Sequence, residues 1–146
     1  MRGYCGIGLF NPKNHINIGA VLRAAHCFEA AFVAAQGKRY RKAITDTMKA
    51  HKHMPLFHTD DLQSIIPFDC VPVAVDFVDG AVPLQDYEHP ERAFYIFGAE
   101  DGTLGKKVTD YCRDKIYIPM RGCLNLAACV NVVLYDRRAK QWTHKS

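Results

Sequence analysis

Metal-binding patterns are missing from this sequence. Its six cysteines form no C-x-x-C pair, and its seven histidines offer His51-x-His53 and the step from His26 to Cys27 as the groupings closest to a ligand set. Neither grouping has the second pair of ligands that a tetrahedral zinc site requires. We therefore expect no metal, and we expect the unpaired cysteines to act as small apolar core residues.

Long apolar runs are also missing. The longest candidate, residues 124–135, is interrupted by Asn125 and Asn131, whereas a membrane helix needs roughly 20 consecutive apolar residues. The first residues do not combine a basic start, an apolar run and a small-residue cleavage site. Together with the scattered cysteines, these absences predict a soluble protein of the reducing cytoplasm that has no membrane partner.

The composition is that of an ordinary packed protein. The chain has 146 residues, of which 49% are hydrophobic and 23% are charged, and this length matches the common size of one globular domain. We expect residues 1–146 to form a single domain. The net charge of +4 permits a polyanionic partner but does not identify one.

Short apolar runs alternate with segments of helical spacing. The runs predict strands at 4–10, 32–35, 71–77, 92–97 and 116–118, and the spacing predicts helices at 14–28 and 124–140, with a short helix from 60 to 66. Because parallel strands need crossover connections, this alternation predicts an α/β fold with a mostly parallel sheet flanked by helices. The basic segment 38–58 is expected to lie at the surface.

The last predicted helix has few polar positions before Arg137 and Arg138. A helix that is apolar on most sides must be covered on most sides. In so short a chain the simplest cover is a second copy of itself, which predicts a homodimer.

Three segments carry possible chemistry, and the first is residues 17–23 (NIGAVLR). Arg23 shares a helix face with small or apolar neighbours three and four residues away. Two interpretations stay open. One is a structural ion pair with a carboxylate such as Glu100; the other is a clamp on an anion or a hydroxyl, for which the planar guanidinium fork is well suited.

The second segment, residues 97–105 (FGAEDGTLG), is a glycine-rich turn directly after a predicted strand. Glycines at the carboxyl end of a strand let backbone groups approach a ligand, and that edge is where open α/β sheets bind cofactors. A tight turn without a ligand would have much the same sequence. The segment is not G-x-G-x-x-G, so it does not favour a nicotinamide site.

The third segment, residues 118–126 (IPMRGCLNL), leads from a strand into the apolar helix. Asn125 stands at the helix start, where capping is its default role. Cys123 beside Arg121 is a conceivable low-pKa nucleophile. No histidine is tied to it in sequence, however, which favours a buried structural thiol.

In this order and at these separations, the three segments resemble the motifs of the SpoU (TrmH-like) family of SPOUT RNA 2′-O-methyltransferases, over nearly the whole chain. In size the chain is most similar to the minimal TrmL (YibK-like) group, which modifies the wobble ribose of tRNA. The resemblance implies an α/β fold with a C-terminal deep trefoil knot. It also implies S-adenosylmethionine as cofactor, RNA as substrate with tRNA expected, and a homodimer.

The resemblance implies residue roles by position. Arg23 matches the catalytic arginine that acts on the ribose hydroxyl or its neighbouring phosphate, and Asn17 and Glu100 accompany it as catalytic residues. The residues expected to bind the cofactor are Val75, Asp76, Phe97, Gly98, Glu100, Gly102, Ile118, Pro119, Met120, Cys123, Leu124, Asn125 and Ala127.

Two positions depart from the family pattern. Cys123 stands where the family often has serine, which exchanges a hydroxyl for a weaker thiol, and the glycine expected at Thr103 comes one residue earlier, at Gly102. A non-catalytic RNA-binding homologue is therefore an alternative. An rRNA 2′-O-methyltransferase is another, because the sequence does not identify the RNA. A nucleotide-binding enzyme of unrelated chemistry is a weaker one, because no phosphate-loop or dinucleotide fingerprint is present.

Substrate RNA is expected along the basic segment and beside the third motif. The residues are Lys38, Arg39, Arg41, Lys42, Lys49, Lys52 and Arg121, with Arg137 and Arg138 of the partner subunit as possible additions. The alternative is that these charges only solvate a surface. Phosphate contacts would make RNA affinity fall steeply as salt rises, and surface solvation would not.

Overall fold

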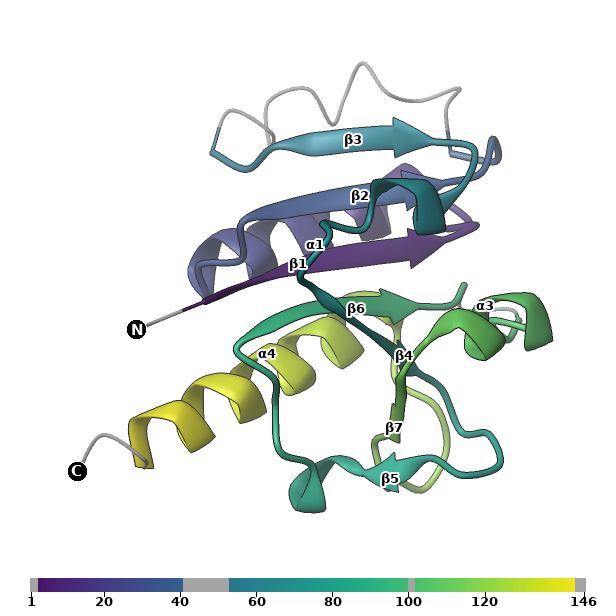
Figure 1. Ribbon diagram of the computed structural model, residues 1–146. Helices are drawn as coiled ribbons and strands as arrows, with labels where there is room; N and C mark the ends of the chain where they lie inside the picture. The colour runs from purple at the N-terminus through teal and green to yellow at the C-terminus, as the bar shows by residue number, and fades with distance from the viewer. Residues whose placement is uncertain (1–2, 41–52, 100–101, 144–146) are drawn as a thin grey trace.

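The computed structural model describes residues 3–40, 53–99 and 102–143 (Figure 1). Strands and helices alternate along them, as predicted. The strands are β1 (Tyr4–Phe10), β2 (Phe32–Gln36), β3 (Leu56–Thr59), β4 (Val71–Val75), β5 (Val82–Pro83), β6 (Arg92–Phe97) and β7 (Asp114–Tyr117). The helices are α1 (His15–Cys27), α3 (Lys106–Tyr111) and α4 (Leu126–Thr143), and the 3-10 turns are η3 (Leu62–Ile65) and η4 (Leu84–Asp86).

The strands form one seven-stranded sheet in the order β3-β2-β1-β6-β4-β7-β5. Every neighbouring pair is parallel, which confirms the predicted α/β class. The carboxyl ends of the central strands therefore lie along one edge, where Phe97 pairs with Leu9 on one side and with Val75 on the other. This edge is where open parallel sheets bind ligands.

Helices cover both faces of the sheet. Helices α1 and α4 lie side by side on one face (Figure 1), where Val21 and Val130 pack in a cluster with Tyr95 of β6. On the other face Leu62 of η3 packs in a cluster with Phe94. Neighbouring residues of β6 thus belong to opposite clusters, because successive side chains of a strand point to opposite faces.

The basic segment 38–58 is not simply a surface loop, so this prediction was wrong in part. Tyr40 and Met54 are only 3% and 4% exposed, and β3 begins at Leu56 within the segment. Between them, residues 41–52 lie outside the described part of the chain. The strand predicted at 116–118 is also displaced, because β7 ends at Tyr117 and Ile118 already belongs to the loop that follows.

The cysteines divide into three groups, and Cys129, which is partly buried, stands between the other two. Cys5, Cys70 and Cys112 are buried, as predicted, and burial raises the pKa of Cys5 to about 11. Cys27 and Cys123 are exposed, so the prediction of a core position is wrong for both. The six thiols are all free.

No described helix is long and apolar enough to cross a membrane. Within residues 3–40, 53–99 and 102–143, no group of three or more possible metal ligands comes together. The C-terminal knot and the single-domain organisation stay predictions.

Candidate active site

A cavity of about 590 Å³ opens beside the carboxyl ends of β4, β6 and β7. The second and third sequence segments, which are separate in the chain, meet around it. Of the residues predicted to bind a cofactor, those that line the cavity are Val75, Asp76, Phe97, Gly98, Gly102, Ile118, Pro119, Met120, Cys123 and Leu124. Asn125 and Ala127 are not among the lining residues, and Glu100 lies outside the described part of the chain.

Asp76 connects the end of β4 to the glycine-rich turn. Its Oδ2 accepts a hydrogen bond from the backbone N–H of Leu104 at 3.1 Å. Within the turn, the N–H of Gly102 donates to the carbonyl oxygen of Ala99 at 3.2 Å. A Cβ at Gly98 would lie 3.4 Å from the nitrogen of Leu104, so the turn folds back closely on itself. These contacts make one wall of the cavity.

The third segment forms the opposite wall as a loop that leads into α4. Gly122 has φ of +84°, in the left-handed region that favours glycine. Asn125 Oδ1 accepts a hydrogen bond from the backbone N–H of Ala128 at 2.8 Å, so its side chain caps α4, its default role in a helix start. The loop is therefore fixed by β7 at one end and by a capped helix at the other.

Six lining residues were not predicted from the sequence, namely Phe77, Ala99, Tyr117, Gly122, Leu126 and Cys129. The rings of Phe77 and Tyr117 meet edge to face with centroids 4.9 Å apart, and Phe77 is 80% exposed, so they form an aromatic rim. Burial is the main cause that raises the pKa of the Cys129 thiol, which keeps it neutral in the cavity wall.

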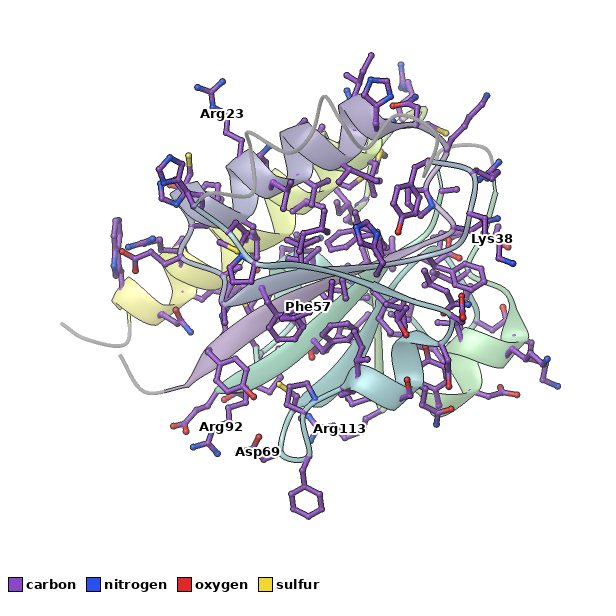
Figure 2. All side chains as sticks on the ribbon, turned by 90° about the horizontal axis from the view of Figure 1, so that it is seen from above. Arg23, Lys38, Phe57, Asp69, Arg92 and Arg113 are labelled. Atoms are coloured by element: carbon purple, nitrogen blue, oxygen red, sulfur yellow. The ribbon has the colours of Figure 1, made fainter. Side chains whose placement is uncertain are left out.

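Arg23 lies outside this cavity. It is exposed and projects from α1 away from the sheet (Figure 2). Asn17 is in the first turn of α1, where its backbone N–H donates to Asn14 Oδ1 at 3.0 Å, and it does not line the cavity either. A single chain therefore does not bring the two catalytic candidates of the first segment to the cavity.

The predicted RNA-binding residues that the structure describes lie in two places. Lys38 and Arg39 are exposed and follow β2 after Gly37, so they lie toward the carboxyl edge of the sheet, and Figure 2 shows the side chain of Lys38. Arg121 is exposed in the loop between the lining residues Met120 and Gly122. The other predicted RNA-binding residues, Arg41, Lys42, Lys49 and Lys52, lie outside the described part of the chain.

Arg137 is not available to a partner's RNA, so this sequence prediction was wrong. The residue is 5% exposed. Its guanidinium donates to the carbonyl oxygens of Pro90 and Glu91, both at 2.7 Å, and to the hydroxyl of Tyr95 at 3.1 Å. These bonds attach α4 to the segment that precedes β6, which is a structural role.

A comparison with sequence models of protein families places the chain in one of them. A sequence model described as the SpoU rRNA Methylase family matches residues 5–135. The chain therefore belongs to the SpoU methylase family, which confirms the resemblance found in its three segments. No curated protein matches the chain by sequence.

Solved structures of SpoU proteins share this fold. The SpoU methyltransferase AviRb from Streptomyces viridochromogenes, in complex with the cofactor AdoMet, has a TM-score of 0.83 and is 18% identical over 97% of this chain and 59% of its own. The TrmH/SpoU tRNA modifying enzyme of A. aeolicus has a TM-score of 0.79 and is 19% identical over 97% and 78%.

A third structure, described as giving insights into the 2-OH methylation of C/U34 on tRNA, has a TM-score of 0.82. It is 21% identical over 97% of this chain and 98% of its own. The lengths of the relatives differ. This chain spans 59% of AviRb and 57% of an rRNA methyltransferase from Sinorhizobium meliloti.

Proposed function

We propose that this protein is an S-adenosylmethionine-dependent RNA 2′-O-ribose methyltransferase. The observation that carries the proposal is that two motif segments of a SpoU family chain meet around one cavity at the ligand-binding edge of a parallel sheet. Membership of the family gives the reaction class. The cavity gives a place where the chemistry would occur.

The cavity fits the proposed cofactor in size and in chemistry. Its volume of about 590 Å³ lies within the range of about 300–1,000 Å³ usual for small-molecule sites. Its described walls are mainly apolar, with backbone groups of Gly98, Ala99 and Gly102 and of the 118–124 loop, and with the carboxylate of Asp76. Asp76 is also tied to Leu104, so it would hold the turn in shape around the cofactor.

When bound, the cofactor supplies a sulfonium methyl group, whose transfer to a ribose 2′-oxygen forms an O–C bond, breaks the C–S bond and leaves a neutral thioether. The residues of this chain would place the acceptor in line with that methyl group. The hydroxyl proton would pass to water or to a neighbouring RNA phosphate. Arg23 would not accept it, because arginine stays protonated in proteins; it would orient the hydroxyl and stabilise the developing negative charge.

Arg23 can do this only if a second copy of the chain brings it to a cavity, because it lies outside the cavity of its own chain. We therefore include a homodimer in the proposal. Its support is that α1 and α4, which lie side by side, leave large apolar side chains exposed: Ile16 is 70%, Val132 38% and Tyr135 60% exposed. Exposed large apolar side chains are typical of protein interfaces where they form a contiguous patch.

The Arg23 assignment is tested with Arg23→Ala. We expect methyl transfer to be abolished, whereas the affinity for S-adenosylhomocysteine measured by calorimetry stays within twofold of the wild type. A mixed dimer of Arg23→Ala with the cavity-blocked Gly98→Leu should recover part of the activity, because one intact cavity then faces one intact arginine. Loss of cofactor binding in a folded Arg23→Ala protein would contradict the assignment.

The dimer is tested separately with Tyr135→Asp, since a charge at this exposed apolar position should separate the copies. Sedimentation equilibrium should give a dimer mass for the wild type and a monomer mass for the variant. Lys13→Ala, an exposed change outside α1 and α4, serves as the control. A monomeric wild type at micromolar concentration would contradict this part of the proposal.

For the substrate we propose tRNA, with the wobble nucleotide as the candidate position. The support is the similarity in size to a structure that concerns C/U34 of tRNA, which this chain matches over 98% of that chain. The alternatives are an rRNA substrate and a non-catalytic RNA-binding homologue. A cytoplasmic location is proposed from the six free cysteines, because disulfides are rare in that compartment.

The experiment is transfer of radiolabelled methyl groups to separate unmodified tRNA and rRNA fractions. Incorporation into tRNA, abolished by Arg23→Ala, is the expected result. Incorporation into rRNA alone would contradict the proposed tRNA substrate but support the proposed methyl-transfer reaction. No incorporation into either fraction by a protein that binds S-adenosylhomocysteine would favour the non-catalytic homologue.

A further inference from the structure

The aromatic rim stands at the mouth of the proposed cofactor cavity. Its two members, Phe77 and Tyr117, both line the cavity, and their rings meet edge to face with centroids 4.9 Å apart. Phe77 is 80% exposed, whereas Phe97, the third aromatic residue of the described lining, is 2% exposed. A large apolar ring that lines a cavity and also faces the solvent is placed to contact a ligand that enters the cavity.

The backbone around the rim is fixed. The N–H of Asp76 donates to the carbonyl oxygen of Ile116 at 2.9 Å, which joins the residues directly before Phe77 and Tyr117. On its other side Tyr117 pairs with Pro83 of β5. The exposed ring of Phe77 therefore stands on a fixed backbone and against a neighbouring ring.

The proposed reaction would bring a nucleobase to this place. In a nucleotide the base is attached to C1′ of the ribose, and the reacting oxygen is attached to the adjacent carbon, C2′. If the 2′-oxygen reaches a methyl group inside the cavity, the base must therefore lie close by. Bases that are drawn out of the stack of an RNA loop are commonly held on aromatic side chains. Such a ring accepts any base, because every base has a π-face.

We propose that the base of the acceptor nucleotide stacks on the ring of Phe77, which Tyr117 supports from the side. The inference rests on the proposed function and adds a substrate-binding residue to it. Phe77 would hold the base, and through it the ribose, so that the 2′-hydroxyl lies in line with the methyl group. It would exchange no proton and would not select one base over another.

The experiment compares Phe77 with Phe68, a matched control at the other end of the same strand. Phe68 is fully exposed and precedes β4, whereas Phe77 follows it. Each is replaced by leucine, which keeps an apolar side chain without the ring, and by tryptophan, which keeps a ring. Three quantities are measured: the dissociation constant of a fluorescein-labelled unmodified tRNA transcript over a range of KCl concentrations, the dissociation constant of S-adenosylhomocysteine, and kcat/KM for methyl transfer.

For Phe77→Leu we expect tRNA binding about tenfold weaker, as the loss of one base stack predicts, and kcat/KM lower by a similar factor. The slope of tRNA affinity against salt should equal that of the wild type, because no phosphate contact is lost. Binding of S-adenosylhomocysteine should be unchanged. Phe77→Trp should keep the tRNA affinity, and both Phe68 variants should match the wild type in every measurement.

Tryptophan emission reports the stack directly. The chain has one tryptophan, Trp142, so the emission that Phe77→Trp adds is obtained by subtracting the spectrum of the wild type. Unlabelled tRNA should quench the added emission, because a base stacked on an indole ring quenches its fluorescence. The emission that Phe68→Trp adds should not change. A ring that only supported the cavity wall would not produce this difference.

A Phe77→Leu protein with the tRNA affinity and kinetics of the wild type would overturn the inference and leave the proposed function intact. Quenching of Phe77→Trp by S-adenosylhomocysteine alone would overturn it in favour of the adenine of the cofactor. A monomer mass for Phe77→Leu beside a dimer mass for the wild type, in sedimentation equilibrium, would overturn it in favour of a contact between subunits.

The fluorescence readout does not require turnover, so it also tests the stack if the wild type transfers no methyl group. A wild type that binds no tRNA would overturn the inference together with the proposed substrate. Urea unfolding midpoints equal to that of the wild type verify that the exposed substitutions leave the fold intact.

Discussion

Replacing Gly122 with alanine should cost about 1–2 kcal/mol in the loop that forms one wall of the cavity. The residue has φ of +84°, and no heavy atom lies within 4 Å of a Cβ built there. The new methyl group therefore meets no neighbour, and the cost comes from the backbone alone. A left-handed conformation costs a non-glycine residue roughly 1–2 kcal/mol, which is a factor of about 5–30 in an equilibrium constant.

Gly102→Ala is the matched control. Gly102 lines the same cavity and also has no heavy atom within 4 Å of a built Cβ, but its φ is outside the left-handed region. The cost of Gly122→Ala can reduce either of two quantities: the free energy of unfolding, measured with urea, or the affinity for S-adenosylhomocysteine, measured by calorimetry. If the loop keeps its shape, the free energy of unfolding falls; if the loop relaxes, the cofactor affinity falls. A Gly122→Ala protein with the free energy of unfolding of the control and the cofactor affinity of the wild type would refute the reasoning.

Three further predictions test the packing and the buried polar groups. Gly8→Ala places a Cβ 2.7 Å from the ring of Phe94 and should lower the free energy of unfolding by about 1–3 kcal/mol; an unchanged urea midpoint would contradict it. Burial lowers the pKa of His89 to about 4, so between pH 6.5 and 4 the unfolded state binds the proton that the folded state refuses. As the pH falls through this range, the free energy of unfolding should fall by up to about 1.4 kcal/mol per pH unit. His89→Gln cannot titrate at this position and should lack this part of the pH dependence. Identical pH profiles of the two proteins would argue against the prediction. Arg137→Leu removes three hydrogen bonds. The carbonyl oxygen of Glu91 still accepts from the N–H of Tyr4, but the carbonyl oxygen of Pro90 and the hydroxyl oxygen of Tyr95 lose their donor, which at about 1–3 kcal/mol each should lower the free energy of unfolding by about 2–6 kcal/mol. Arg138→Ala, whose carboxylate partner is exposed and 3.5 Å away, should lower it by less than about 1 kcal/mol; equal losses of the two variants in urea unfolding would contradict the larger contribution of the buried bonds.

The regular elements that the sequence predicts are those with strong local patterns. The apolar strands β1, β4 and β6 and the helices α1 and α4 follow from periodicity, and Asn14 caps α1 as its side chain suggests. Short elements were missed. Helix α3 has only six residues and no side-chain cap, and β5 has two residues, so neither is long enough to establish a period.

The glycine-rich turn was predictable as part of the cavity wall because it follows a strand at the carboxyl edge of a parallel sheet, and the family resemblance gave the other predicted residues of the wall. The aromatic rim was not, since Phe77 and Tyr117 meet across two strand ends that are forty residues apart in the chain. Burial of Tyr40 within a basic segment likewise depends on a distant partner, His58. Helical spacing gives the face of the helix on which Arg23 lies. It does not say whether that face is directed at the cavity of the same chain or away from it.

The position of the transferred methyl group tests the central claim most directly. RNA methylated by the purified wild type is digested to nucleosides and examined by tandem mass spectrometry, in which the glycosidic bond breaks and the sugar and base separate. The account predicts that the added methyl mass stays with the ribose. A methyl group found on the base would contradict it.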